Sequence, residues 1–267
     1  MLIRFLRYTA MLSLAAIVGG FVSAQVVAQE ELSYAQYRKL SWVADRLGHM
    51  AKFEPLHGQN GMFFAFAERW GTVQVIKVDS NGSKRVWKSN QLSGVPEEVL
   101  AADLDGDSLE DSFVCRTTTG KLYAWSMDGY DLLWESLSGE YQTISCFTIA
   151  NMDEDPASEI VMVADNRVVY IDGTNFNKQF TSSFDYEATQ IRCADVDGDS
   201  RIEIVLNTGK VLDSFTGDVE WEGESFFAKI ELMDIDGDGI PEVITENPGG
   251  GPVKAFDVGH QSEVRFQ

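Results

Sequence analysis

The chain has 267 residues, 44% of them apolar, and its formal net charge at pH 7 is −21. This length and apolar content are sufficient for a sizeable buried core, so we expect one folded domain. A surface this acidic repels nucleic acid and anionic lipid, which excludes both as expected partners.

The first residues have the organisation of a secretory signal peptide. Arg4 and Arg7 precede an apolar run of small residues that extends from about residue 9 to residue 24. We therefore expect a signal peptide at 1–24, with a second cleavage site after Ala28, and a secreted or periplasmic protein without a membrane span after cleavage. The alternative is an uncleaved anchor, and the glycines and polar residues that interrupt the run favour cleavage.

The segment 30–48 is predicted to form one short helix. Ser33 and Gln36 have the spacing of a capping box, and Gly48 is a stop signal after an apolar face. We expect this helix to pack against its own domain, and a docking helix for a partner is the sharper alternative.

Four nine-residue segments, 103–111, 151–159, 195–203 and 234–242, repeat one pattern of acids. Oxygen-bearing side chains at positions 1, 3, 5 and 9 are what a cation of the size of calcium requires. The alternative is an acidic surface turn, but four copies in one register favour up to four Ca²⁺ sites. The expected metal ligands are Asp103, Asp105, Asp107, Asp111, Asn151, Asp153, Asp155, Glu159, Asp195, Asp197, Asp199, Glu203, Asp234, Asp236, Asp238 and Glu242.

The second copy of this pattern departs most from the others. Asn151 replaces the aspartate at position 1, and Pro156 occupies position 6. Because ligand charge contributes to calcium affinity, we expect the second site to bind less tightly than the other three.

The residues after each acidic segment predict strands rather than helices. Short β-branched and apolar runs follow all four segments, which argues against an EF-hand, where the loop leads into a helix. A second repeat places aromatic residues 47, 46, 41 and 45 residues apart by subtraction, at Trp87, Trp134, Phe180, Trp221 and Phe266. This spacing is typical of a four-stranded β-propeller blade.

These motifs resemble those of the FG-GAP and VCBS repeat family, whose blades also occur in integrin α-subunit heads. The resemblance is carried by Asp-x-Asp-Gly-Asp at 103–107, 195–199 and 234–238, and it covers about residues 50–267. It implies an all-β fold, a β-propeller at 49–267 with calcium in its loops. Members of the family commonly have about seven or eight blades, whereas this chain has the length for about five, and its first unit lacks an acidic loop.

The same resemblance implies a binding or scaffolding role rather than catalysis. The three histidines lack metal-ligand spacing, and no nucleophile or phosphate-binding motif occurs in the sequence. We expect an exported protein-binding, scaffold or adhesion module that is not an enzyme, with a protein partner in the envelope or extracellular space.

Two alternatives remain at this point. One is a lectin-like propeller that binds a glycan through exposed tryptophans. Trp87, Trp134 and Trp221 occupy equivalent positions and are expected to pack between blades, whereas Trp42 and Trp70 are better candidates for exposure. The other is a quinoprotein-like envelope assembly scaffold, suggested by segment 212–221. Three cysteines, Cys115, Cys146 and Cys193, are expected in strands, as buried free thiols or with one disulfide-bonded pair.

Overall fold

The structure is a computed structural model that describes residues 50–58, 61–79, 82–153, 155–226, 229–246 and 253–264. The chain divides into two units, Met1–Met50 and Ala51–Gln267, and the described residues belong to the second unit apart from Met50. The expected signal peptide at 1–24 and the expected helix at 30–48 lie outside the described residues. Within the described part of the chain, no helix is long and apolar enough to cross a membrane.

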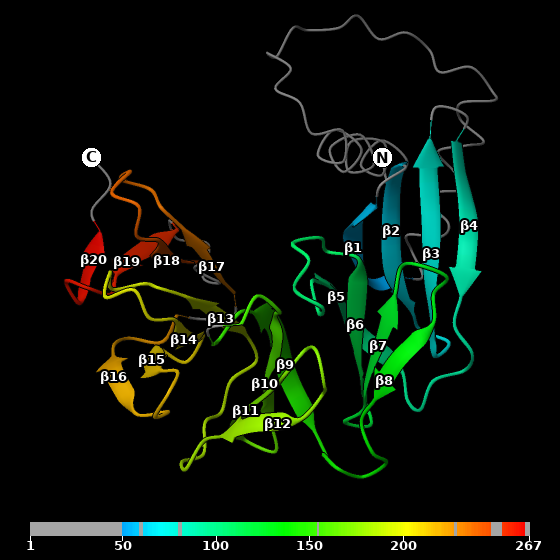
Figure 1. The fold of residues 1–267 in the computed structure, drawn as a ribbon. Helices are drawn as coiled ribbons and strands as arrows, with labels where there is room; N and C mark the ends of the chain where they lie inside the picture. The colour runs from blue at the N-terminus through cyan, green and yellow to red at the C-terminus, as the bar shows by residue number, and fades with distance from the viewer. Residues whose placement is uncertain are drawn as a thin grey trace, which may run out of the picture. The chain divides into compact units, whose positions relative to one another are not determined.

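The described residues form five antiparallel sheets of four strands each, which confirms the prediction of an all-β fold with about five four-stranded units (Figure 1). In every sheet the strands are hydrogen-bonded in chain order. The strands are β1 (Met50–Gly58), β2 (Gly61–Glu68), β3 (Thr72–Asp79) and β4 (Gly82–Lys88) in sheet 1; β5 (Pro96–Ala102), β6 (Ser112–Thr117), β7 (Leu122–Ser126) and β8 (Leu132–Glu135) in sheet 2; β9 (Ile144–Ala150), β10 (Glu159–Ala164), β11 (Arg167–Ile171) and β12 (Lys178–Thr181) in sheet 3; β13 (Ile191–Ala194), β14 (Glu203–Leu206), β15 (Lys210–Asp213) and β16 (Val219–Glu222) in sheet 4; and β17 (Ile230–Met233), β18 (Glu242–Thr245), β19 (Lys254–Asp257) and β20 (Ser262–Val264) in sheet 5.

The second strands of sheets 3 and 4 are buried on both of their faces. Every residue of β10 and β14 is buried, which explains why these strands read as continuous apolar runs instead of alternating patterns. Successive side chains of a strand point to opposite faces. In β10, Ile160 and Met162 therefore pack towards sheet 2, whereas Val161 and Val163 pack towards sheet 4.

The apolar core is divided into four clusters, and each cluster is shared by two consecutive sheets. Phe113 belongs to the cluster between sheets 1 and 2, Ile160 to the next one, Ile204 to the third and Val243 to the last. The first strands β5, β9, β13 and β17 also contact one another in that order. Each fully buried aliphatic side chain contributes roughly 1.5–3 kcal/mol, so these clusters join the sheets strongly.

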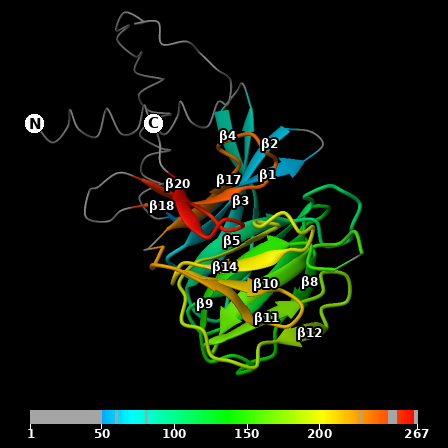
Figure 2. The same cartoon turned by 90° about the vertical axis from the view of Figure 1, so that its left-hand side faces the viewer.

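The fourth strands of sheets 2, 3 and 4 are exposed except for one aromatic residue each. The strands β8, β12 and β16 share the same burial pattern, in which only Trp134, Phe180 and Trp221 are half-buried. This pattern keeps the apolar residue on the side that faces the next sheet, while the outer face stays in water. Figure 2 shows the fourth strand β12 beside β11.

Aromatic residues of the fourth strands pack on the following sheet. Trp87 stacks on Tyr130 with ring centroids 5.4 Å apart, and Trp134 stacks on Phe176 at 5.1 Å. Trp221 lies 6.1 Å from Phe256 of sheet 5. These contacts confirm that the equivalent tryptophans pack between units.

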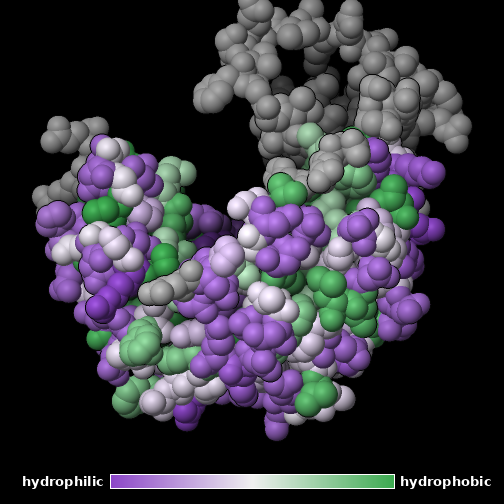
Figure 3. All heavy atoms as spheres, in the orientation of Figure 1, coloured by the Kyte–Doolittle hydropathy of each residue, from purple (hydrophilic) through white to green (hydrophobic). Residues whose placement is uncertain are grey.

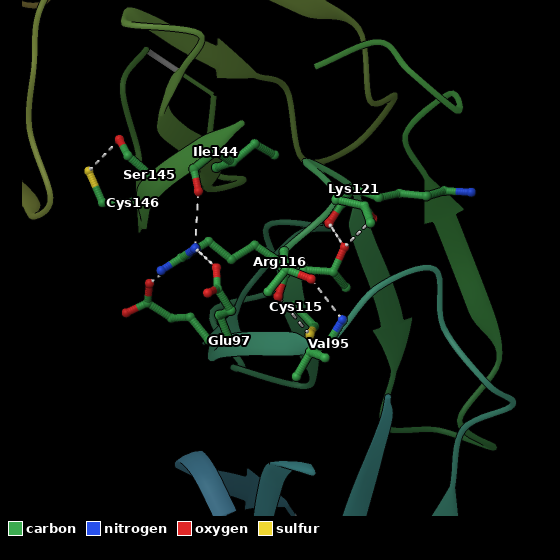
Figure 4. A network of polar contacts seen from close by, with 12 residues as sticks. Val95, Glu97, Cys115, Arg116, Lys121, Ile144, Ser145 and Cys146 are labelled. Carbon is green, nitrogen blue, oxygen red and sulfur yellow. Dashed lines mark hydrogen bonds and ion pairs between the residues drawn. The ribbon is translucent and has the colours of Figure 1, made fainter. Parts of the chain in front are cut away.

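A partly buried ionic network also joins sheets 2 and 3 (Figure 4). Arg116 of β6 forms an ion pair with Glu98 at 3.0 Å, and a second ion pair with Glu97. Its guanidinium group also donates to the carbonyl oxygen of Ile144, at the start of β9, at 3.0 Å. Because the donors of the guanidinium are distributed over partners from two sheets, the charge is compensated at the junction.

The surface has the character that the composition predicts. The face shown in Figure 3 is mostly hydrophilic, and its hydrophobic residues form small separate groups. The three cysteines lie in strands, as expected, at Cys115 in β6, Cys146 in β9 and Cys193 in β13, and their thiols are free.

Candidate metal sites

The four acidic segments occupy the same structural position in four consecutive sheets. Each one connects the first strand of a sheet to the second strand. We name them loop 1 (103–111, sheet 2), loop 2 (151–159, sheet 3), loop 3 (195–203, sheet 4) and loop 4 (234–242, sheet 5), and we number their positions 1 to 9. The repeat in the sequence is therefore also a repeat in the structure, because each acidic loop joins the first and second strands of its sheet.

Three loops bring the acids at positions 1, 3 and 5 together. In each group one carboxylate oxygen of every acid lies within 4.8 Å of one oxygen of the other two acids, and the groups are Asp103, Asp105 and Asp107 in loop 1, Asp195, Asp197 and Asp199 in loop 3, and Asp234, Asp236 and Asp238 in loop 4. Carboxylates this close repel one another unless a cation lies between them. The arrangement therefore has the spacing that a cation site needs.

The backbone of the loop holds the aspartate at position 1. One carboxylate oxygen of Asp103 accepts a hydrogen bond from the amide of Gly106, and the other accepts from the amide of Ser108, both at 2.8 Å. The same pair of hydrogen bonds recurs at Asp195 and Asp234. Because the loop fixes its own first acid, little ordering remains when a ligand binds.

Loop 2 is built differently at position 1. Pro156 at position 6 has no amide hydrogen, so the second of these two hydrogen bonds cannot form. Asn151 instead donates from its side-chain nitrogen to the carbonyl oxygen of Asp155 at 2.5 Å. The acidic group of loop 2 consists of Asp153, Asp155 and Glu159, again with oxygens within 4.8 Å of one another.

The glutamates at position 9 of loops 2, 3 and 4 are the first residues of β10, β14 and β18. Glu159, Glu203 and Glu242 are 0%, 2% and 4% exposed. One oxygen of each accepts a hydrogen bond from the backbone amide at position 2, at 2.5, 2.8 and 2.9 Å respectively. Each glutamate therefore closes its loop.

The position-9 acids differ in their relation to the other acids. Asp111 of loop 1 lies before β6 and is half-buried, and it does not join the group formed by positions 1, 3 and 5. Among the position-9 acids that the structure describes, Glu159 alone is part of an acidic group. The structure thus brings together twelve of the fifteen acids among the expected ligands, and Asp111, Glu203 and Glu242 lie outside these groups.

Burial and crowding raise the pKa of several of these acids. The pKa of Glu159 is raised to about 7 by burial, with a further contribution from Asp153 and Asp155, against the lowering effect of the Met152 amide. Burial likewise raises the pKa of Glu203 to about 7. The pKa of Asp111 is also raised, by burial and by the charges of its own loop. A bound cation would reverse these shifts, because it stabilises the charged forms.

Neighbouring loops contact one another. The amide of Ser158 in loop 2 donates to the carbonyl oxygen of Asp103 in loop 1 at 2.8 Å. A Cβ atom on Gly106 would lie 2.8 Å from the ring of Pro156, so this glycine allows the two loops to approach. In loops 3 and 4, a Cβ atom on Gly198 would lie 2.5 Å from Ile240. Loop 1 therefore packs on loop 2, and loop 3 packs on loop 4.

Two further residues border loop 2. The side-chain amide of Gln179 on β12 donates to Asp153 at 2.9 Å and to Asp172 at 3.2 Å. Asp172 lies in the turn after β11, and it accepts hydrogen bonds from the amides of Thr174 and Asn175. No pattern in the sequence points to Gln179, because its contact depends on the pairing of β12 within the sheet.

The donor atoms of these groups fit a hard divalent cation. All of them are carboxylate oxygens, which calcium and magnesium prefer and softer metals do not require. In addition, oxygen Oε1 of Glu159 is buried and has no hydrogen-bond partner within the described residues. A buried carboxylate oxygen without a partner is costly, and a cation would satisfy it.

The chain resembles solved structures in fold. It matches the crystal structure of Saccharomyces cerevisiae Sqt1 with a TM-score of 0.56 and 13% identity, covering 74% of this chain and 56% of that chain. It matches the crystal structure of the computationally designed Ika8 protein with a TM-score of 0.56 and 16% identity, covering 79% and 60%. The chain thus spans somewhat more than half the length of each. No family model and no curated protein matches the chain.

Proposed function

We propose that the five sheets are the blades of a β-propeller with FG-GAP/VCBS-like repeats. The chain order of strands within each sheet supports this, because propeller blades are four-stranded units of this kind. Packing supports it as well, since each apolar cluster is shared by two consecutive sheets and the first strands contact one another.

The four acidic loops are calcium sites in this proposal. The observation that supports calcium binding is the convergence of three carboxylates within 4.8 Å in the loop between the first and second strands of four sheets. A divalent ion would replace the repulsion among these acids by attraction. Outside the cytosol, where the signal peptide predicts the protein to be, calcium is plentiful, so the weak affinity of an extracellular module would suffice.

Metal content tests the calcium sites directly. The protein purified with calcium should carry up to four ions by mass spectrometry, and Asp236→Ala should lower the content by about one. Asp128→Ala is a matched control, since Asp128 is an exposed acid in the turn between β7 and β8, outside the loops. Protein without bound calcium at millimolar calcium would contradict this proposal.

The role we propose for the propeller is a non-catalytic platform for a protein partner in the envelope or extracellular space. The acids whose pKa is raised towards 7, Glu159 and Glu203, both belong to the calcium loops and are accounted for there. Large apolar side chains such as Leu137 and Phe184, 75% and 60% exposed, are available for contacts on the connections between sheets.

Capture from an envelope extract tests the platform. The immobilised protein should retain a partner in calcium and lose part of it in EGTA, because calcium bound to the loops would stabilise the folded chain that presents these connections. Leu137→Asp and Phe184→Asp should each weaken retention without changing the calcium content. Equal retention by all variants, with and without calcium, would argue against a partner at this surface.

A glycan is a second candidate ligand, and one observation favours it. A hollow of about 410 Å³ between β4 and β8 is lined by residues that include Trp87, Asn90, Tyr130 and Asp131. Trp70 is 69% exposed, as expected for it, and its carbonyl oxygen accepts a hydrogen bond from Gln91, which also lines the hollow. Binding on a glycan array that Trp70→Ala weakens would favour this ligand over a protein.

A further inference from the structure

Loop 2 is the loop whose sequence departs most from the repeat, and the structure gives it the most deeply buried ligand set. Its acidic group includes Glu159, which is 0% exposed, whereas all three acids in the group of loop 4 are exposed. Exposed carboxylates are screened by water and salt, so their attraction for a cation is weak. A buried carboxylate attracts a cation more strongly, because the surroundings are less polar.

The carboxylate of Glu159 has one free oxygen for a ligand. Oxygen Oε2 accepts the amide of Met152, and Oε1 is buried without a hydrogen-bond partner among the described residues. The Oε1 atoms of Glu203 and Glu242, the equivalent glutamates, are not in this condition. An unsatisfied buried oxygen next to Asp153 and Asp155 indicates that a cation belongs there.

The other members of the group are held in place from several sides. Asp153 accepts a hydrogen bond from Gln179 at 2.9 Å, and Asp155 accepts one from the amide of Ala157 at 2.8 Å. Ser158 ties the loop to Asp103 of loop 1. Ligands fixed on strands and by neighbouring hydrogen bonds lose little freedom when an ion binds, which raises affinity.

We propose that loop 2 binds calcium first among the four loops, with Glu159 as a direct ligand, whereas Glu203 and Glu242 position their loops without touching the ion. This inference rests on the proposed calcium binding by the loops. It reverses the order that the sequence pattern predicts, in which Asn151 and Pro156 make loop 2 the weakest site.

A calcium titration of the full chain by calorimetry tests the order, using Glu159→Gln and Glu203→Gln as matched variants. Both changes keep a side-chain oxygen that accepts the amide at position 2, and both remove one buried charge. Glu159→Gln should weaken the tightest binding phase at least about tenfold, the loss that even an outer partner of a metal ligand causes. Glu203→Gln should act on a later phase only.

Metal-free thermal unfolding provides a second readout. Glu159→Gln should raise the midpoint of the metal-free protein, because a neutral amide replaces a buried unpaired charge, and it should reduce the rise that calcium causes. If Glu159→Gln keeps the tightest phase, or if Glu203→Gln removes it, the proposed order is wrong although the protein binds calcium. If the unaltered chain takes up no calcium, the proposed function itself fails.

Discussion

At the residue scale, Asn151 and Pro156, the two departures of loop 2 from the repeat, are structurally related. An aspartate at position 1 uses both oxygens to accept backbone amides, as Asp103 does from Gly106 and Ser108. A proline at position 6 removes one of those amides, and Asn151 offers one oxygen and one amino group in place of two oxygens. The sequence pattern presents these residues as two defects, because the hydrogen bonds that relate them are not visible in it.

Two loop glycines provide a matched pair for stability. Gly106 and Gly237 both have positive φ, +76° and +84°, so alanine should cost about 1 kcal/mol at either position. A Cβ atom would lie 2.8 Å from Pro156 at Gly106, whereas at Gly237 it would have no described residue within 4 Å. Gly106→Ala should therefore lower the free energy of unfolding by about 1–3 kcal/mol more than Gly237→Ala, measured with urea. Equal losses would show that loops 1 and 2 do not press on each other.

The buried glutamates predict a pH dependence in calcium-free buffer. The pKa of Glu203 in the folded chain is raised from 4.5 to about 7 by burial. The folded state therefore binds this proton more tightly than the unfolded state. The stabilisation that protonated Glu203 gives to the folded state is complete below pH 4.5 and is lost as the pH rises to about 7. Urea unfolding should show a flatter dependence in this window for Glu203→Gln than for the unaltered chain. An identical slope in both proteins would contradict the raised pKa.

At the element scale, the sequence predicts the strands and the aromatic repeat better than their contacts. The spacing of Trp87 and Trp134 indicates equivalent positions in successive sheets. Their partners Tyr130 and Phe176 have positive φ, 59° and 57°, which few non-glycine residues adopt. The stacking was not predictable from the sequence, because it depends on how the tryptophan of one sheet lies against a turn of the next sheet.

Two neighbours on β8 test the contribution of this stacking. Trp134 is half-buried against Phe176, and Leu133 is 45% exposed. Trp134→Ala should lower the free energy of unfolding by about 2–3 kcal/mol, below the loss at a fully buried aromatic, because part of the ring is in water. Leu133→Ala should change it by about 0.5 kcal/mol or less. Chemical unfolding measures both, and similar losses would contradict the packing role.

At the scale of the whole molecule, the sequence was sufficient to predict the number of sheets and the position of every acidic loop. Both follow from local patterns, namely strand runs, turn residues and acid spacing. The contacts between loops were out of reach, since the distance between Ser158 and Asp103 depends on how sheet 3 packs on sheet 2. The sequence likewise could not predict that Glu159 is part of an acidic group whereas Glu203 is not.

Calcium should stabilise the whole chain if the loops bind it. An ion present at about 100 times its dissociation constant adds about 2.7 kcal/mol per site, which corresponds to about 5–10 °C in the midpoint of thermal unfolding for a chain of this size. Scanning calorimetry with excess calcium and with EGTA measures the difference, with magnesium as the control for general ionic effects. Equal midpoints in calcium and EGTA would contradict binding at the loops.

The division of the apolar core into clusters shared by neighbouring sheets has a consequence for how the number of sheets can change in evolution. Sheets 2, 3 and 4 each share clusters on two sides, and sheets 1 and 5 share one each within the described chain. Such an array behaves like a row of linked units whose strength depends on adjacent members alone. Duplication or deletion of one sheet would change only the apolar contacts with the sheets next to it. Ancestral lengthening by tandem duplication would therefore leave more distant sheets undisturbed.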